Sequence, residues 1–254
     1  MVVVDAHCHI GLGRLKRQTA EELLREMDRC GVERAVVCPV DQYIAVYNKE
    51  GNDYIAEAVR AHPDRLVGFA SVNPWYGERG VEELERAVGM GLSGLKLHPA
   101  LQGFFANDEL VYSLIEKSRE LGIPIYVHTN TPVHAMPFQV ADLAEQFPDV
   151  PFVLGHMGFA DGWTDVVSAV TSLSNVYLET SLSLPMPISE AVADLGADRV
   201  VFGSDSPESS LEAELYKIRI LDLDEVARRK ILGENIERVL EGGLSKVNNY
   251  SLEI

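Results

Sequence analysis

Eight short runs of apolar, often β-branched residues alternate with amphipathic stretches along the whole chain. Nearly continuous apolar strands separated by helices are typical of a parallel sheet that is covered on both faces. Eight such units predict one α/β domain, residues 1–254, that closes into a (β/α)8 barrel of the TIM type with a C-terminal helical extension around residues 224–240. The alternative is an open, doubly wound sheet. The expected strands are residues 2–6, 34–39, 66–72, 93–98, 124–128, 151–156, 176–179 and 200–205.

Two sequence signals predict where helices begin. Thr19 followed by Glu22 has the pattern of a capping box, and Gly31 is a typical stop signal for the helix that begins there. Ser206 and Pro207 predict a second helix directly after the eighth strand, because serine caps helices and proline suits their first turn.

The net charge and the cysteine count limit which binding partners and which cellular compartment we expect. The chain has 22 Lys and Arg against 39 Asp and Glu, a net charge of −17, which argues against nucleic acid or an anionic membrane surface as a partner. No run approaches the roughly 18 apolar residues of a membrane span, and the start lacks the pattern of a signal peptide. Three cysteines are too few for a disulfide framework. We therefore expect a cytoplasmic protein.

Five of the eight expected strands run apolar and then end in histidine, lysine or an acid. Parallel strands in a barrel end at one rim, where such barrels carry their active sites. Since residues two apart share a strand face, Asp5, His7 and His9 should point together and Cys8 away from them, and Lys96 should share a face with His98. The residues expected at the rim are His7, His9, Lys96, His128, His156 and Asp205.

Taken one at a time, these residues have ordinary explanations. A histidine at a strand end can simply be hydrogen-bonded there, and Asp205 could do no more than cap the following helix. Together they are costly to bury unless something satisfies them, and a divalent cation would satisfy several at once. Imidazoles with one carboxylate suit zinc, with iron, nickel or manganese as alternatives.

The same residues make the chain resemble the amidohydrolase superfamily, in the branch that contains metal-dependent hydrolases and non-oxidative decarboxylases. The resemblance implies that His7, His9, His128 and Asp205 bind one divalent metal. It also implies that His156 contacts the metal-bound water or the substrate, or binds a second metal. The motifs that carry it are residues 5–9 (Asp-Ala-His-Cys-His), 68–74, 94–99 (Gly-Leu-Lys-Leu-His-Pro), His128, 155–156, 203–205 and 231–235.

Lys96 matches the position at which binuclear members hold a carbamylated lysine between two ions, so one or two ions are expected. Without that modification, the buried lysine would need an acid such as Glu179 nearby. The pairing of Lys96 with His98 favours hydrolysis, because decarboxylase members of the branch usually lack it.

We therefore expect an enzyme that hydrolyses a small amide, lactone or ester with a metal-bound hydroxide. Asp205 would move the proton, and His156 and His98 would polarise the substrate carbonyl. One alternative is a lyase that removes CO2 from an aromatic or unsaturated acid at the same metal, and another is a non-catalytic barrel that binds a metal or ligand. The substrate is a small molecule, which Arg14, Lys16 and Arg17 could meet if it is anionic, although that loop could equally be solvated. A homodimer is the default expectation.

Overall fold

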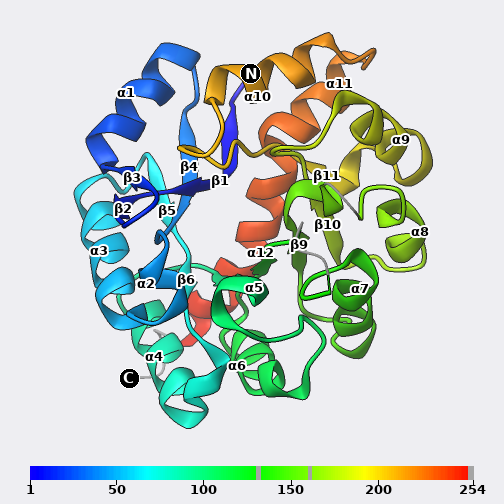
Figure 1. Cartoon of the computed structure of the whole chain (residues 1–254). Helices are drawn as coiled ribbons and strands as arrows, with labels where there is room; N and C mark the ends of the chain where they lie inside the picture. The colour runs from blue at the N-terminus through cyan, green and yellow to red at the C-terminus, as the bar shows by residue number, and fades with distance from the viewer. Residues whose placement is uncertain (130–132, 160–161, 251–254) are drawn as a thin grey trace.

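Eight parallel strands form the centre of the computed structural model, which describes residues 1–129, 133–159 and 162–250 (Figure 1). The third strand consists of two pieces, β5 and β6, separated by Phe69. Every expected strand is present, and all but β10 have shifted ends. The strands are β1 (Val4–His9), β4 (Arg34–Cys38), β5 (Leu66–Gly68) with β6 (Ala70–Ser71), β7 (Leu95–Leu97), β8 (Ile125–Val127), β9 (Phe152–Leu154), β10 (Val176–Glu179) and β11 (Val200–Val201).

The strands pair in chain order and close on themselves. β1 pairs with β4 and β4 with β5, while β6 begins the parallel series that runs to β11. The Phe69 N–H donates to the Val37 carbonyl at 2.9 Å and so joins the two series. Closure comes from bonds between β1 and the segment after β11: the Ala6 N–H donates to the Phe202 carbonyl at 2.9 Å, and the Asp205 N–H donates to the His7 carbonyl at 2.8 Å. The predicted barrel is confirmed.

The last strand is shorter than expected, because the chain leaves β10 after Val201 and bonds to β1 instead. The next helix, α10 (Leu211–Ile220), does not begin at Ser206 and Pro207 as predicted. Ser206 does not cap it, because its hydroxyl donates to Gln18 Oε1 at 2.9 Å.

Helices cover the outside of the barrel, and the first of them begins as predicted (Figure 1). In α1 (Ala20–Cys30) the Thr19 hydroxyl accepts from the Glu22 N–H and the Glu22 carboxylate accepts from the Thr19 N–H; the helix ends at Gly31 with φ 75°. The other long helices are α3 (Asn48–Ala61), α4 (Glu78–Gly89), α6 (Tyr112–Leu121), α7 (Pro137–Gln146), α9 (Pro185–Leu195) and α10, and the short ones are α2 (Gln42–Ala45), α5 (Pro99–Gln102), α8 (Val166–Val170) and α11 (Glu225–Arg229). Within the described ranges, no helix is both long enough and apolar enough to span a bilayer.

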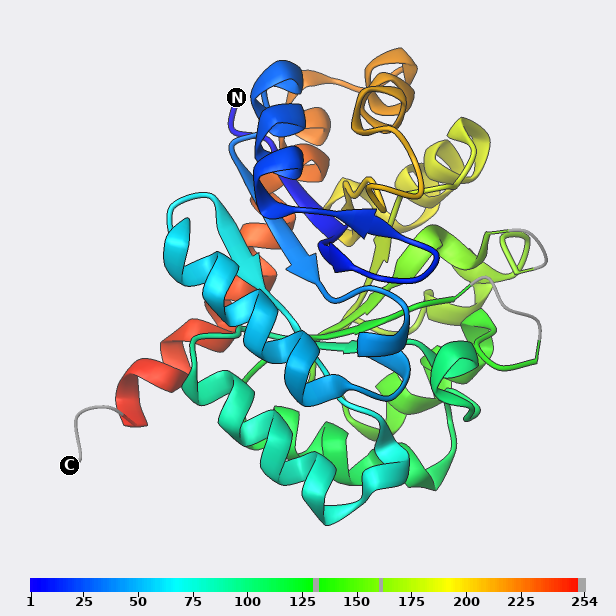
Figure 2. The same cartoon turned by 60° about the vertical axis from the view of Figure 1, so that its left-hand side comes forward.

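The C-terminal helix α12 (Asn235–Tyr250) closes one end of the barrel (Figures 1 and 2). Its Ile236, Val239 and Leu240 pack in one apolar cluster with inward residues such as Val4 and Ala6 of β1. A larger apolar layer lies between the strands and the surrounding helices. Since α12 fills the end at which the strands begin, we expect a ligand to enter from the end at which the strands finish.

Candidate metal centre

A β-bulge in β1 decides which of its side chains reach the barrel mouth. Asp5 pairs with Ala35 and Cys8 with Val37, so β1 takes three steps where β4 takes two. The extra residue leaves Asp5 on the same side as Cys8, whose Sγ lies 3.0 Å from Asp5 Oδ2. The expectation that Asp5 points together with His7 and His9 is wrong, because simple alternation fails at the bulge.

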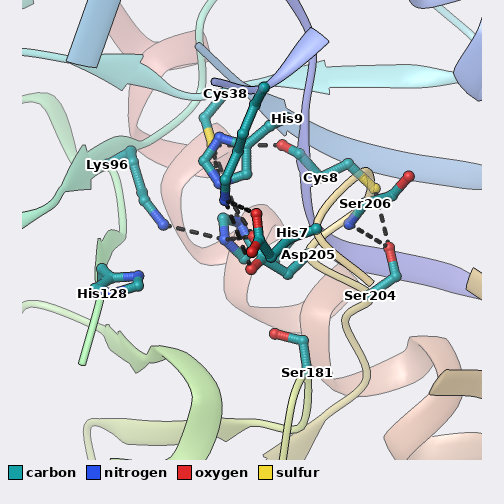
Figure 3. Close-up of polar contacts among 12 residues, drawn as sticks. His7, Cys8, His9, Cys38, Lys96, His128, Ser181, Ser204, Asp205 and Ser206 are labelled. Carbon is teal, nitrogen blue, oxygen red and sulfur yellow. Dashed lines mark hydrogen bonds and ion pairs between the residues drawn. The ribbon is translucent and has the colours of Figure 1, made fainter. Parts of the chain in front are cut away.

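His7, His9 and Asp205 converge at the mouth of the barrel, where they point toward one another (Figure 3). The Nε2 atoms of His7 and His9 each lie 3.2 Å from the same oxygen of Asp205, Oδ1. All three side chains are buried. Burial opposes ionisation of Asp205, but the hydrogen bonds from His7 and His9 hold its pKa well below the usual range. The carboxylate is therefore charged and shared between two imidazoles.

The hydrogen bonds of His9 orient its ring for binding. His9 Nδ1 lies 2.6 Å from the Pro39 carbonyl oxygen, which can only accept, so Nδ1 carries the hydrogen. Burial opposes the change, but Cys38 and the hydrogen bond to Asp205 raise the pKa of His9 to about 9, so Nε2, which faces Asp205, also carries a hydrogen, and a bound metal would replace it. Metal-binding histidines are commonly fixed in this way by a backbone carbonyl.

His156 joins this group, and His128 lies one step further away. His7, His156 and Asp205 each offer a donor atom within 4.8 Å of the other two. His128 Nδ1 lies 2.9 Å from His156 Nε2, and the His128 ring stacks on that of His98 with a 3.7 Å centroid distance. The structure thus brings His7, His9, His156 and Asp205 together and places His128 beside His156.

The protonation states of His156 and His7 suit a cation. Burial lowers the pKa of His156 to about 4 and holds the pKa of His7 well below its usual value, so both rings are neutral. Neutral imidazole is the form that binds metals. Two Nε2 atoms and a carboxylate oxygen that meet at one buried point are a donor set for zinc, manganese or iron. The residues present therefore fit a divalent ion.

Lys96 lies in the same interior but not beside the acid that we expected. Its Nζ is 3.1 Å from His7 Nε2 and 3.9 Å from the centroid of the Tyr126 ring, and burial lowers its pKa to about 8. Glu179 accepts instead from Tyr126 at 2.7 Å and from Ser181 at 2.8 Å. Glu179 is thus close enough for its charge to oppose the lowering of the Lys96 pKa, as the expectation of a nearby acid requires, but its direct partners are these two hydroxyls.

Glu179 organises a buried polar cluster that we did not expect from the sequence. Its Oε2 also accepts the His156 backbone N–H at 3.2 Å, and Ser181 Oγ lies 2.8 Å from His156 Nδ1. Ser181 gives its single hydrogen to Glu179, so it must accept from His156 Nδ1–H, which puts the His156 lone pair on Nε2. The sequence contains one indication that Tyr126 belongs to this interior. Tyr126 lies two residues before His128 in an expected strand and so shares its face.

Cys38 is a second residue that sequence reasoning missed. Its Sγ lies 3.3 Å from His9 Nδ1, and Cys38, His7 and His9 form another group whose donor atoms lie within 4.8 Å of one another. Cys38 ends β4, so the position that singled out the histidines also applied to this thiol.

A pocket of about 400 Å³ opens beside these residues, in the size range of small-molecule sites. Its walls are the stacked imidazoles of His98 and His128, apolar side chains, one lysine and two acids. The lining residues are His9, Leu15, Lys16, Asp41, Ile44, His98, Leu101, His128 and Glu208.

A sequence model of the protein family described as Amidohydrolase matches residues 4–242, and this chain belongs to that family. The chain is 23% identical to a gamma-resorcylate decarboxylase from Polaromonas sp. JS666 over 280 residues, which cover 86% of each protein. Its fold is similar to that of a dihydroxybenzoic acid decarboxylase from Polaromonas sp. JS666, solved with manganese and the inhibitor 2-nitroresorcinol (TM-score 0.77, 19% identity, 100% of this chain and 99% of that one). It is also similar to 5-carboxyvanillate decarboxylase from Sphingomonas paucimobilis (TM-score 0.76, 16% identity, 94% and 99%).

These comparisons correct the expected reaction. We expected hydrolysis of an amide, lactone or ester, but the relatives that match most of the chain are named decarboxylases. The hydrolase prediction is therefore wrong, and its lyase alternative agrees better with the comparisons. The preference for zinc is likewise not supported by the Polaromonas structure, whose metal is manganese.

Proposed function

We propose that this protein is a metal-dependent, non-oxidative decarboxylase of a small aromatic or unsaturated carboxylic acid. The observation that carries the proposal is that His7 and His9 both lie 3.2 Å from Asp205 beside a pocket of about 400 Å³. The similarity to named decarboxylases over 86% of the chain supports the reaction type. The expected homodimer and cytoplasmic location stay predictions.

The metal in this proposal is divalent, manganese or zinc. His7, His9 and Asp205 would hold it together with His156 or His128, and Lys96 would contribute only if carbamylated, beside a second ion. A divalent ion supplies a Lewis acid that holds and polarises oxygen atoms of a substrate.

The side chains of the pocket must supply a proton and orient the substrate. Loss of CO2 from a carboxylate leaves an electron pair on carbon, and one proton must arrive there (R–COO⁻ + H⁺ gives R–H + CO2). We assign proton transfer to Asp205, which is a carboxylate in the free protein and would take up a proton from the solvent or from a substrate hydroxyl before it passes that proton to the carbon. Its Oδ1 lies between the two histidines, and its Oδ2 is turned toward Lys16, 3.9 Å away, at the pocket wall. His156, whose Nε2 carries a lone pair, would accept a hydrogen bond from a substrate hydroxyl near that carboxylate if His128 rather than His156 holds the metal.

His98 would orient the substrate. The His98 Nδ1 accepts from the Leu101 N–H at 3.3 Å, so its hydrogen lies on Nε2, where the ring can donate to a substrate oxygen. Because burial holds its pKa well below the usual value, the ring is neutral. The stacked faces of His98 and His128 also form a flat wall that suits an unsaturated ring.

The test is direct detection of CO2 from protein loaded with manganese or zinc. The panel contains 2,6-dihydroxybenzoate, 5-carboxyvanillate and unsaturated aliphatic acids. We expect release of CO2 from at least one acid, loss of activity after chelation, and recovery after the metal is restored. Asp205→Asn should lower kcat by at least about 100-fold, since general acid catalysis is typically worth that much. Asp194→Asn, on the exposed side of α9, is the matched control.

Absence of CO2 from every acid, with the metal bound stoichiometrically, would contradict the proposal and favour the non-catalytic metal-binding barrel. Full activity of Asp205→Asn would contradict only the role given to that residue.

A further inference from the structure

A short hairpin lies between β1 and α1 (Figure 2), and its Lys16 lines the pocket. Its strands, β2 (Gly11–Leu12) and β3 (Arg17–Gln18), pair antiparallel, so residues 13–16 form the turn. Among the described residues that line the pocket, Lys16 is the only one with a permanent positive charge. Its Nζ lies 3.2 Å from Glu208 Oε2 and 3.9 Å from Asp205 Oδ2. The ammonium group therefore stands between the solvent and the metal centre.

Asp41 fixes this turn from the neighbouring loop, after β4. Its Oδ2 accepts the Leu15 N–H at 2.6 Å and the Lys16 N–H at 2.8 Å. Asp41 is the N-cap residue of α2, yet its side chain makes no cap bond to that helix, and its φ of 41° is unfavourable for a residue with a side chain. Asp41 therefore makes no helix cap and has an unfavourable backbone conformation, while its side chain holds the main chain of Lys16.

Gly13 leaves the space that this contact needs. A Cβ atom at Gly13 would lie 2.3 Å from Asp41 Oδ2, which is closer than atoms can approach. The turn, Asp41 and Gly13 therefore together fix the position of Lys16.

The charges around Lys16 suit exchange with an anionic ligand. The Glu208 side chain is 51% exposed, and an ion pair to such a group contributes little, so a ligand carboxylate can replace it at small cost. The chain carries a net charge of −17, which repels anionic substrates at long range. A fixed cation at the pocket offsets that repulsion where the acid must bind.

We propose that Lys16 binds the substrate carboxylate and that Asp41 is the positioning residue that holds Lys16 in place; the identity of the acid rests on the decarboxylase function proposed above. Since CO2 leaves as a neutral molecule, the bond to Lys16 is stronger in the bound substrate than in the transition state. Lys16 therefore contributes to KM rather than to kcat, and it does not retain the product, which lacks the carboxylate.

The experiment uses the full-length, metal-loaded protein and titration calorimetry with 2,6-dihydroxybenzoate and with resorcinol, its neutral decarboxylated counterpart. Lys16→Met should weaken binding of the acid about tenfold and leave resorcinol binding unchanged, because only the acid offers a carboxylate. Lys16→Arg should restore most of the affinity. Arg14→Met and Arg17→Met, in the same hairpin and with the same charge change, are the matched controls.

A second variant tests the position rather than the charge. Gly13→Ala keeps Lys16 but displaces Asp41, so it should reproduce the selective loss of acid binding. With any acid that releases CO2, both variants should raise KM about tenfold without lowering kcat, because the bond they remove is stronger in the bound substrate than in the transition state.

Equal losses in Lys16→Met and Arg14→Met would overturn the proposal, because the effect would then be one of net charge. Equal weakening of the acid and resorcinol, or wild-type protein that binds none of the acids in the panel, would also overturn it. Binding of the acid that depends on Lys16, without any CO2, would keep Lys16 as a carboxylate site and contradict the decarboxylase function.

Discussion

The buried carboxylate of Glu179 provides a quantitative test of the interior of the barrel. Burial raises its pKa from 4.5 to about 7, although the hydrogen bonds from Tyr126, Ser181 and His156 oppose the change. Glu179→Gln removes the titration and keeps the size of the side chain. The amide must turn its NH2 group toward donors, so the variant loses at least one hydrogen bond at every pH.

The sign and the size of the effect follow from proton linkage. The folded protein binds the Glu179 proton more tightly than the unfolded chain does, so the stabilisation is complete below the ordinary pKa of 4.5 and is lost as the pH rises through about 7. A pKa difference of this size corresponds to about 3 kcal/mol, of which about 2 to 3 kcal/mol is lost between about pH 5 and about pH 8. The lost hydrogen bond in Glu179→Gln costs about 1 to 3 kcal/mol and does not depend on pH.

Urea unfolding of the metal-free protein at these two pH values measures both effects. Wild type should have a larger free energy of unfolding than Glu179→Gln at the lower pH. At the higher pH the wild-type value should fall by about 2 to 3 kcal/mol relative to that of the variant. Glu145→Gln, on the exposed side of α7, should stay parallel to wild type. If Glu179→Gln is also parallel to wild type, Glu179 does not titrate in this range and the reasoning is refuted.

Three further outcomes are expected. Gly203→Ala should lower the melting temperature by several degrees in calorimetry, because its Cβ would lie 2.3 Å from Glu179 Oε1. Asp5→Ala should weaken metal binding at least about tenfold in equilibrium dialysis, since Asp5 Oδ1 accepts the His7 N–H at 3.0 Å and fixes the bulge; unchanged affinity would contradict this. Cys38→Ser should lower the affinity for zinc more than that for manganese in a competition titration, because a thiol is the softer donor.

Periodicity was sufficient to predict the barrel, because strand and helix alternation depends on local sequence. Phe152–Leu154 and Val176–Glu179, for example, lie inside expected ranges and pair as neighbours. The ends of the strands were less predictable, since they depend on partners distant in the chain. Val200–Val201 is short because the following residues bond to β1, and no local signal indicates that contact.

In the candidate site, too, some features could be predicted from local sequence and others depend on residues distant in the chain. His7, His9 and Asp205 were predicted to meet because each follows an apolar strand, and they do meet. The side chain of Asp5 was misplaced because a β-bulge is set by the pairing of two strands and does not appear in the pattern of one. Glu179 was noticed as a possible partner for Lys96 and not as the centre of a cluster, because two of its hydrogen bonds come from other strands, from Tyr126 in β8 and from His156 after β9.

The error about the reaction has a structural cause. Lys96 and His98 were read as one functional pair, but β7 ends at Leu97 and His98 is the N-cap residue of α5. The alternation that should place the two side chains together therefore stops between them. Lys96 contacts His7 in the interior, whereas His98 stacks on His128 at the pocket wall. Lys96 and His98 therefore do not act as one pair that could indicate hydrolysis. The metal donors do not decide the reaction either, because the same donors can serve hydrolysis or decarboxylation. The discriminating chemistry is in the groups that meet the substrate, which makes Lys16 more informative than Lys96.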